Sequence, residues 1–153
     1  MSGADELLID TNVLLYEYDK NEPAKSQLAQ RLLPQIFAAG RALLTTQCAS
    51  EFYWNATRKL AVPLTHVEAL TAIQSNYVVM HVVPVTWDML TKAFDVIGKH
   101  GMPLWDAQIL AAAVLHGAKI IVSEDFQHRG ILEGVTFINP FAADFVITDI
   151  LRP

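Results

Sequence analysis

Cysteine is almost absent from this sequence, since Cys48 is the only one in 153 residues. A single cysteine excludes a disulfide within the chain and fits a reducing compartment, and we interpret its thiol as a small buried apolar group. The N-terminus lacks the basic segment and small-residue cleavage site of a signal peptide. No run approaches the roughly 18 apolar residues that a membrane span needs. These absences predict a cytoplasmic protein that does not use a membrane.

Positive charge is also scarce, with 11 Lys and Arg against 16 Asp and Glu and a net charge of −5. This balance argues against a protein that grips nucleic acid mainly through a basic surface. It does not exclude a nucleic-acid enzyme, because acids that hold cations make the formal charge overstate how negative the working protein is. Hydrophobic residues are abundant at 52%, which is enough for a sizeable core. We predict a single domain over residues 1–153.

Short apolar runs alternate with segments of helical periodicity along the chain. The predicted strands are residues 7–9, 42–45, 82–85, 119–122 and 135–138. The predicted helices are residues 12–18, 23–39, 46–60, 65–78, 86–98 and 103–117. This alternation predicts an α/β fold with three layers, α/β/α, around a central parallel sheet of about five strands. Pro34 should kink or split the second helix, and Pro84 suggests that the third strand lies at an edge.

The order of the strands decides which side chains meet. If the first strand is central and the chain winds outward on one side before it returns to the other, the first and fourth strands become neighbours at a topological switch point. Asp10 follows the first strand and Asp125 follows the fourth. The topology therefore predicts that these two carboxylates lie close together.

Two further acids are expected at the same carboxyl edge of the sheet. Asp106 falls in the first turn of a predicted helix, and Glu51 in the second turn of the helix after the second strand. Carboxylates about 5 Å apart at an effective dielectric near 20 repel by roughly 3 kcal/mol per pair, so a cluster of four needs protons or cations. Oxygen ligands without a nearby Cys or His pair suit Mg²⁺ or Mn²⁺.

Each acid taken alone also has a purely structural explanation. Asp10 could cap the first helix, and Asp106 could complement a helix dipole. Asp125 could be a turn residue after a strand, and Glu51 could lie on a solvated helix stripe. The sequence leaves these alternatives open residue by residue, whereas the set of four favours a cation site.

At this point the chain resembles the PIN-domain ribonucleases, and more narrowly the VapC-type toxins of toxin-antitoxin modules. The matching segments are Leu-Ile-Asp-Thr-Asn at 8–12, Ser-Glu-Phe at 50–52, Arg-Lys at 58–59, Trp-Asp-Ala-Gln-Ile-Leu-Ala-Ala-Ala at 105–113, Val-Ser-Glu-Asp-Phe at 122–126 and Ile-Asn-Pro-Phe at 138–141. They cover nearly the whole chain and occur in the family's order, so the ordered set carries the resemblance.

The resemblance implies hydrolysis of RNA phosphodiester bonds with one or two Mg²⁺ or Mn²⁺ ions. The residues that match the family's cation-holding acids are Asp10, Glu51, Asp106 and Asp125. Ser123 matches the residue that supports the last acid, where Thr is commoner, and Asn12 matches the polar neighbour that orients the first. The resemblance also implies an RNA substrate, a homodimer and a cognate antitoxin protein.

Several other side chains are candidates for contacts with RNA. Arg58, Lys59 and Arg129 could contact the RNA backbone, with a solvated surface position as the alternative for each. Trp105 could stack on a base, but we interpret it as packed beneath the helix that it precedes. The histidines show no spacing typical of metal ligands.

Other functions use an acid-lined parallel sheet. A phosphotransfer receiver domain needs an accepting Asp after the third strand and a Lys after the fifth, where Val85-Thr86-Trp87 and Asn139-Pro140-Phe141 stand instead. A phosphatase with a nucleophilic Asp needs a second acid two residues after Asp10, where Asn12 stands. A non-catalytic module with an acidic cation site is the remaining alternative.

Overall fold

A computed structural model describes residues 6–151 of the protein, and its centre is a six-stranded sheet. The strands are β1 (Leu7–Ile9), β2 (Ala42–Thr45), β3 (His81–Val83), β4 (Ile120–Val122), β5 (Ile131–Leu132) and β6 (Val135–Ile138). Their order in space is β3-β2-β1-β4-β6-β5. Every pairing is parallel except that of β5 with β6.

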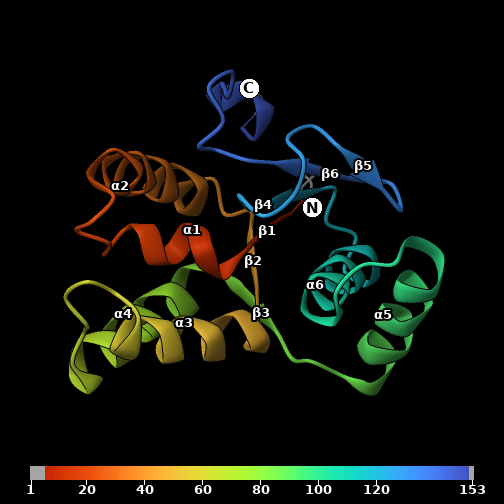
Figure 1. The fold of residues 1–153 in the computed structure, drawn as a ribbon, viewed down its shortest axis with the longest axis horizontal. Coiled ribbons are helices and arrows are strands. Elements are labelled where there is room, and N and C mark those ends of the chain that lie inside the picture. Colours follow the sequence, from red (N-terminus) through yellow and green to blue (C-terminus); the bar gives the residue numbers. More distant parts are fainter. Residues whose placement is uncertain (1–5, 152–153) are drawn as a thin grey trace.

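Helices cover both faces of this sheet (Figure 1). The α-helices are α1 (Thr11–Tyr16), α2 (Pro23–Ala38), α3 (Thr46–Arg58), α4 (His66–Val79), α5 (Trp87–His100) and α6 (Leu104–Leu115), and a 3₁₀ helix, η1, spans Ile147–Asp149. Figure 1 shows α1 to α4 on one side of the sheet and α5 with α6 on the other. Right-handed crossovers require this division, because the chain reverses its direction across the sheet after β3. The predicted three-layer α/β/α fold is confirmed.

The predicted switch point is also present, because β1 pairs with β2 on one side and β4 on the other. Leu8 lies opposite Ile121 and Ile9 opposite Val122. This register brings the residues that follow β1 to the same level as those that follow β4. The third strand is at an edge as predicted, and it ends directly before Pro84.

The number of strands differs from the sequence prediction, and one of the two outcomes predicted for Pro34 is excluded. The sheet has a sixth strand because Ile131–Leu132 folds back on β6 through Glu133 and Gly134, which have φ angles of 51° and 77°. Two central residues with positive φ are the pattern of a tight hairpin turn, and a strand this short leaves no hydrophobic periodicity to detect. Pro34 does not split α2, which is continuous from Pro23 to Ala38.

The core explains why α6 lies so close to the sheet. Its segment from Ala107 to Ala113 is buried throughout, and four alanines in that run let the backbone approach the strands. All of β1 is buried as well, as expected for a central parallel strand. In residues 6–151, no helix has the length and apolar character to cross a bilayer.

Candidate functional site

Asp10 stands at the junction of β1 and α1 and is only 4% exposed. Its backbone N–H donates to the carbonyl of Val122 at 3.0 Å, which continues the pairing of β1 with β4. Its Oδ1 accepts from the Thr11 N–H at 2.7 Å, and its Oδ2 accepts from the Ser123 hydroxyl at 2.7 Å. Asp10 is therefore the N-cap of α1, but only one of its oxygens caps the helix, while the other faces the end of β4.

Asn12 links the end of β1 to the loop after β4. Its Nδ2 lies 3.0 Å from Asp125 Oδ2, 3.2 Å from Ser123 Oγ and 3.4 Å from Asp10 Oδ2. Its Oδ1 accepts from the Glu124 N–H at 3.4 Å. One amide thus contacts two acids that are more than a hundred residues apart in the chain, and it holds their carboxylates toward each other.

Ser123 is fully buried between the same two acids. Its hydroxyl donates to Asp10 and accepts from the Asp125 N–H at 3.1 Å and from Asn12.

We expect Ser123→Ala to lower the free energy of unfolding by about 1 to 3 kcal/mol, because it leaves buried polar groups without a partner. Urea titration measures this loss, and Ser75→Ala, at an exposed position of α4, is the matched control. Equal effects in the two variants would contradict this network.

Glu51 points toward the same edge of the sheet from α3. Its Oε2 accepts from the Thr11 hydroxyl at 3.4 Å, and its Oε1 accepts from Gln47 Nε2 at 2.8 Å. Gln47 in turn accepts a hydrogen bond from the buried amide of Gln108 on α6. The solvated-stripe explanation is therefore wrong for Glu51. Neither glutamine was predicted as a site residue. Gln108 within the alanine-rich segment of α6 could have indicated a polar contact, since a buried amide needs a hydrogen-bond partner.

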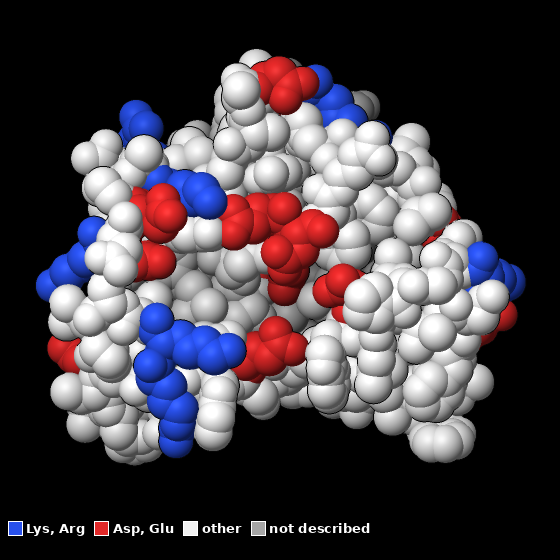
Figure 2. Space-filling view, viewed as in Figure 1, with Lys and Arg blue, Asp and Glu red and all other residues white. Residues whose placement is uncertain are grey.

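The four acids influence one another electrostatically. Burial raises the pKa of Asp10 from 3.8 to about 6, and the negative charges of Asp125 and Glu51 add to the rise, against the hydrogen bonds that it accepts. Burial also raises the pKa of Asp106, with further contributions from Asp125 and Glu51. Figure 2 shows acidic side chains gathered near the centre of this face of the molecule, with Lys and Arg side chains to one side of them. Asp10 and Asp106 therefore both lie close enough to Asp125 and Glu51 for those negative charges to raise their pKa values.

Nothing in residues 6–151 neutralises this cluster by an ion pair: Asp10, Glu51, Asp106 and Asp125 form none with a described Lys, Arg or His. An oxygen-only set of uncompensated carboxylates fits Mg²⁺ or Mn²⁺. Within the same residues, however, no three Asp, Glu, His or Cys side chains are arranged around one point as a bound ion requires. The acids fit the ion in chemistry and location, but their side chains are not set in ligating positions.

The neighbouring Glu124 is occupied differently. It accepts hydrogen bonds from the Tyr16 hydroxyl and from the Lys25 ammonium, the latter at 3.0 Å. The hydrogen bond to the Glu124 carboxylate raises the pKa of Lys25, so the Lys25 ammonium stays charged over the whole neutral range. Glu124 therefore braces the loop that carries Asp125 and does not join the uncompensated acids.

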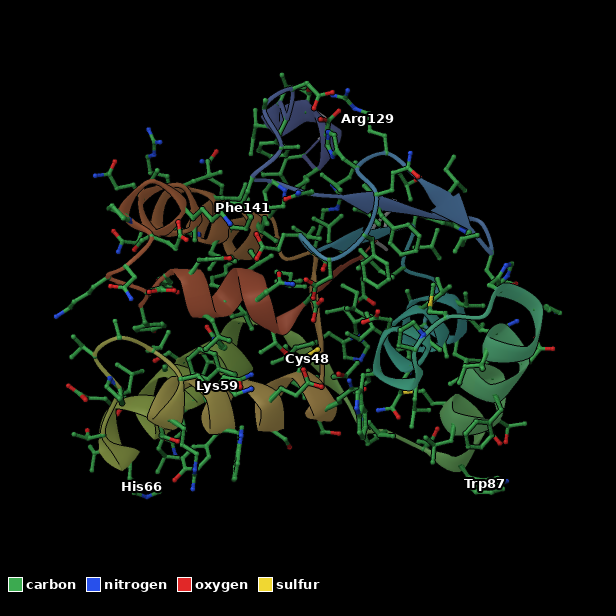
Figure 3. All side chains as sticks on the ribbon, viewed as in Figure 1. Cys48, Lys59, His66, Trp87, Arg129 and Phe141 are labelled. Atoms are coloured by element: carbon green, nitrogen blue, oxygen red, sulfur yellow. The ribbon has the colours of Figure 1, made fainter. Side chains whose placement is uncertain are left out.

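The three basic candidates lie in different places. Arg58 stacks its guanidinium 3.9 Å from the ring centroid of Trp54, and Lys59 follows the end of α3. Arg129 instead pairs with Asp144 at 2.7 Å and Asp149 at 2.9 Å in the C-terminal segment. It lines a separate pocket of about 400 Å³ with residues at the start of β4, at the top of Figure 3. The structure does not bring Arg129 to the acids.

Trp105 contradicts the interpretation that we favoured from sequence. Its side chain is 61% exposed, so it is not packed beneath α6. It directly precedes Asp106, and its backbone carbonyl accepts from Gln47 at 3.5 Å. The packing prediction was wrong because the small side chains of α6 already fill the space against the sheet, which leaves the first turn of the helix at the surface.

A parallel sheet covered on both faces, with a topological switch point between β1 and β4, defines the chain as an open α/β domain, and such domains bind ligands at that edge. The chain belongs to the PIN domain family, whose model matches residues 7–131. This segment contains all four acids, and the match confirms the predicted resemblance. No curated protein matches the chain.

Solved toxin-antitoxin structures share the fold. A toxin-antitoxin complex from Klebsiella pneumoniae is 18% identical, with 89% of this chain and 98% of that chain covered and a TM-score of 0.64. VapC20 from Mycobacterium tuberculosis, a Sarcin-Ricin loop cleaving toxin, is 18% identical, with coverages of 76% and 87% and a TM-score of 0.60. DNA-bound VapBC from Salmonella typhimurium is 15% identical, with coverages of 88% and 97% and a TM-score of 0.57. These identities establish likeness of fold.

Proposed function

We propose that the protein is a metal-dependent endoribonuclease of the cytoplasm that hydrolyses RNA phosphodiester bonds, and that it is the toxin of a toxin-antitoxin module. The observation that carries the proposal is the uncompensated set of four carboxylates at the switch point of a PIN domain. One or two Mg²⁺ or Mn²⁺ ions are the cofactor that such a set would hold. The acids would then explain how a chain with a net charge of −5 handles a polyanion.

The four acids have different parts in this proposal. Asp10 provides a carboxylate oxygen in a fixed position, because Thr11 and Ser123 hold both sides of the group. The less buried carboxylates would have to rotate about their side-chain bonds to reach the same ion, because residues 6–151 contain no preformed three-acid group. For Asp125, Asn12 limits this rotation by donating to the carboxylate, and Ser123 fixes the backbone by accepting from the Asp125 N–H.

A bound cation lowers the pKa of a coordinated water and offsets the negative charge that develops on the phosphate. The protein must also take a proton from the attacking water. We assign this step to Asp106, whose carboxylate belongs to the cluster and can act as a general base. Its position in the first turn of α6, at the edge of the cluster, leaves it accessible to water.

The direct test is incubation of total cellular RNA with the purified protein in Mg²⁺, Mn²⁺ or EDTA, followed by gel electrophoresis. We expect discrete cleavage products with either metal and intact RNA in EDTA. Intact RNA under all three conditions would contradict the ribonuclease proposal and favour a non-catalytic module with an acidic cation site.

We also propose that the protein forms a homodimer and binds a cognate antitoxin. The support is the likeness of fold to toxin-antitoxin complexes and the number of large apolar side chains at the surface. Val67 and Val78 on α4 are exposed, as are Val146 and Ile147 in the C-terminal segment, and such surfaces are usually covered by a partner.

Light scattering at micromolar concentration should give twice the mass of one chain, and a strictly monomeric mass would contradict the dimer.

A further inference from the structure

An open groove of about 940 Å³ lies directly beside the acidic cluster. Glu51 forms part of its wall, so the groove and the candidate site share this residue. Its other main features are two tryptophans, Trp54 from α3 and Trp105 from α6, and the amides of Gln47 and Gln108. The ribonuclease proposal gives this groove no role.

Both tryptophans expose more than half of their side chains to solvent. The Trp54 side chain is 54% exposed and the Trp105 side chain 61%. The guanidinium of Arg58 already stacks on Trp54 at 3.9 Å from the ring centroid. Exposed indole rings with a cation beside them match the platforms on which proteins stack unpaired nucleic-acid bases.

The groove continues past the acids along α3. Gln47, Glu51, Asn55 and Lys59 follow one another at intervals of four residues and so lie in a stripe about 18 Å long. A second pocket, of about 290 Å³, shares Asn55 and Lys59 with the groove and extends to Asn12. Together the two form one path that starts at the tryptophans, passes Glu51 and reaches the residue that contacts Asp10 and Asp125.

The charges along this path suit a phosphate backbone. Neither Arg58 nor Lys59 forms an ion pair with another residue in 6–151, so both cations are available to a ligand. Lys59 lies beside α3 in Figure 3, and Figure 2 shows basic side chains next to the acidic cluster on this face. An aromatic platform followed by available cations is complementary to bases and phosphates in turn.

We propose that this groove binds a single-stranded segment of the RNA adjacent to the bond that is cut, with bases stacked on Trp54 and Trp105 and phosphates next to Arg58 and Lys59. The proposal rests on the proposed ribonuclease function. It requires unpaired RNA, because bases within a duplex do not offer their faces to side chains.

The test measures binding of a dye-labelled, unstructured hexaribonucleotide by fluorescence anisotropy, with Mg²⁺ present and Asp106→Asn as the background that keeps the RNA intact. We expect Trp105→Ala and Trp54→Ala each to weaken binding about ten- to a hundredfold, as loss of one stacked base does. Trp54→Phe should restore most of the affinity, since a smaller ring still stacks. Lys59→Gln should reduce the dependence of binding on salt.

The chain offers a matched control in the first turn of α5. Trp87 precedes Asp88 there just as Trp105 precedes Asp106 on α6, and the Trp87 side chain is 75% exposed but does not line the groove. Trp87→Ala should leave the affinity unchanged. In Trp87→Phe protein, the remaining tryptophan fluorescence should be quenched when the hexaribonucleotide binds.

The outcomes separate this proposal from the one on which it rests. If the wild type cleaves RNA while both groove variants bind the hexaribonucleotide as tightly as Trp87→Ala, the groove is not the RNA path. If the wild type cleaves no RNA but the groove variants lose affinity and the quenching occurs, the groove binds single-stranded RNA and the ribonuclease proposal fails. Circular dichroism of each variant confirms that the fold is retained.

Discussion

Asp10→Asn protein should cleave RNA at least about a hundredfold more slowly than the wild type in Mg²⁺ or Mn²⁺. The substitution keeps the shape of the side chain, and its remaining oxygen can still accept from the Thr11 N–H that caps α1. It removes the negative charge of the most buried of the four acids. A cation would therefore lose a charged ligand at the position where hydrogen bonds from Thr11 and Ser123 hold both carboxylate oxygens. Loss of a metal site costs several kcal/mol of transition-state stabilisation.

Asp106→Asn should reduce cleavage to a similar extent, and Asp88→Asn provides its control. Both aspartates follow a tryptophan in the first turn of a helix, so each complements a helix dipole. Only Asp106 lies near Glu51 and Asp125. We expect Asp88→Asn to cleave at the wild-type rate. Wild-type activity from Asp10→Asn protein, prepared free of contaminating nuclease, would refute the metal-site assignment.

The second large effect concerns the relative stability of the wild type and Asp10→Asn, whose order should reverse between metal-free and metal-bound protein. In EDTA at pH 7, Asp10→Asn should be more stable than the wild type by up to about 3 kcal/mol. This figure follows from the difference between a folded pKa of about 6 and the ordinary value of 3.8, at about 1.4 kcal/mol for each tenfold change in proton affinity. The asparagine carries no charge, so it escapes both the desolvation of a buried carboxylate and the repulsion from the other acids.

The stability difference between the wild type and Asp10→Asn in EDTA should depend on pH. Asp10 has a raised pKa, so the folded state binds its proton more tightly than the unfolded state does between about pH 4 and pH 6. The free energy of unfolding of the wild type should therefore fall relative to that of Asp10→Asn as the pH rises through this range, and the difference should be constant above it. Below about pH 4 the carboxyl is protonated in both states and the two proteins should be equally stable.

Millimolar Mn²⁺ should reverse the order. An ion that binds only the folded state adds about 2.7 kcal/mol at a hundredfold excess over its Kd, and Asp10→Asn should lose much of that gain. Thermal melts of both proteins in EDTA and in Mn²⁺ measure the four values. If the variant is less stable in EDTA and Mn²⁺ leaves the wild type unchanged, Asp10 serves only as a helix cap.

Much of this architecture can be predicted from local pattern. The apolar runs before Asp10 and Ser123 are strands because buried parallel strands carry continuous hydrophobic residues, and the reversal of the winding after the third strand makes β1 and β4 neighbours. Two residues that end neighbouring parallel strands must lie at one edge. The meeting of Asp10 with the segment around Asp125 was therefore determined by the sequence.

The tertiary structure decided the details that depend on contacts between distant segments. The sequence placed Glu51 equally well toward solvent or toward the acids, and only the hydrogen bonds from Gln47 and, through it, from Gln108 on another helix select the second. Trp105 was predicted to be packed, yet it forms a wall of the groove, because its exposure depends on how closely α6 approaches the sheet. Hydrophobic periodicity reports which face of an element is buried, but the partner of each polar atom follows from the register and spacing of elements that meet only in the folded chain.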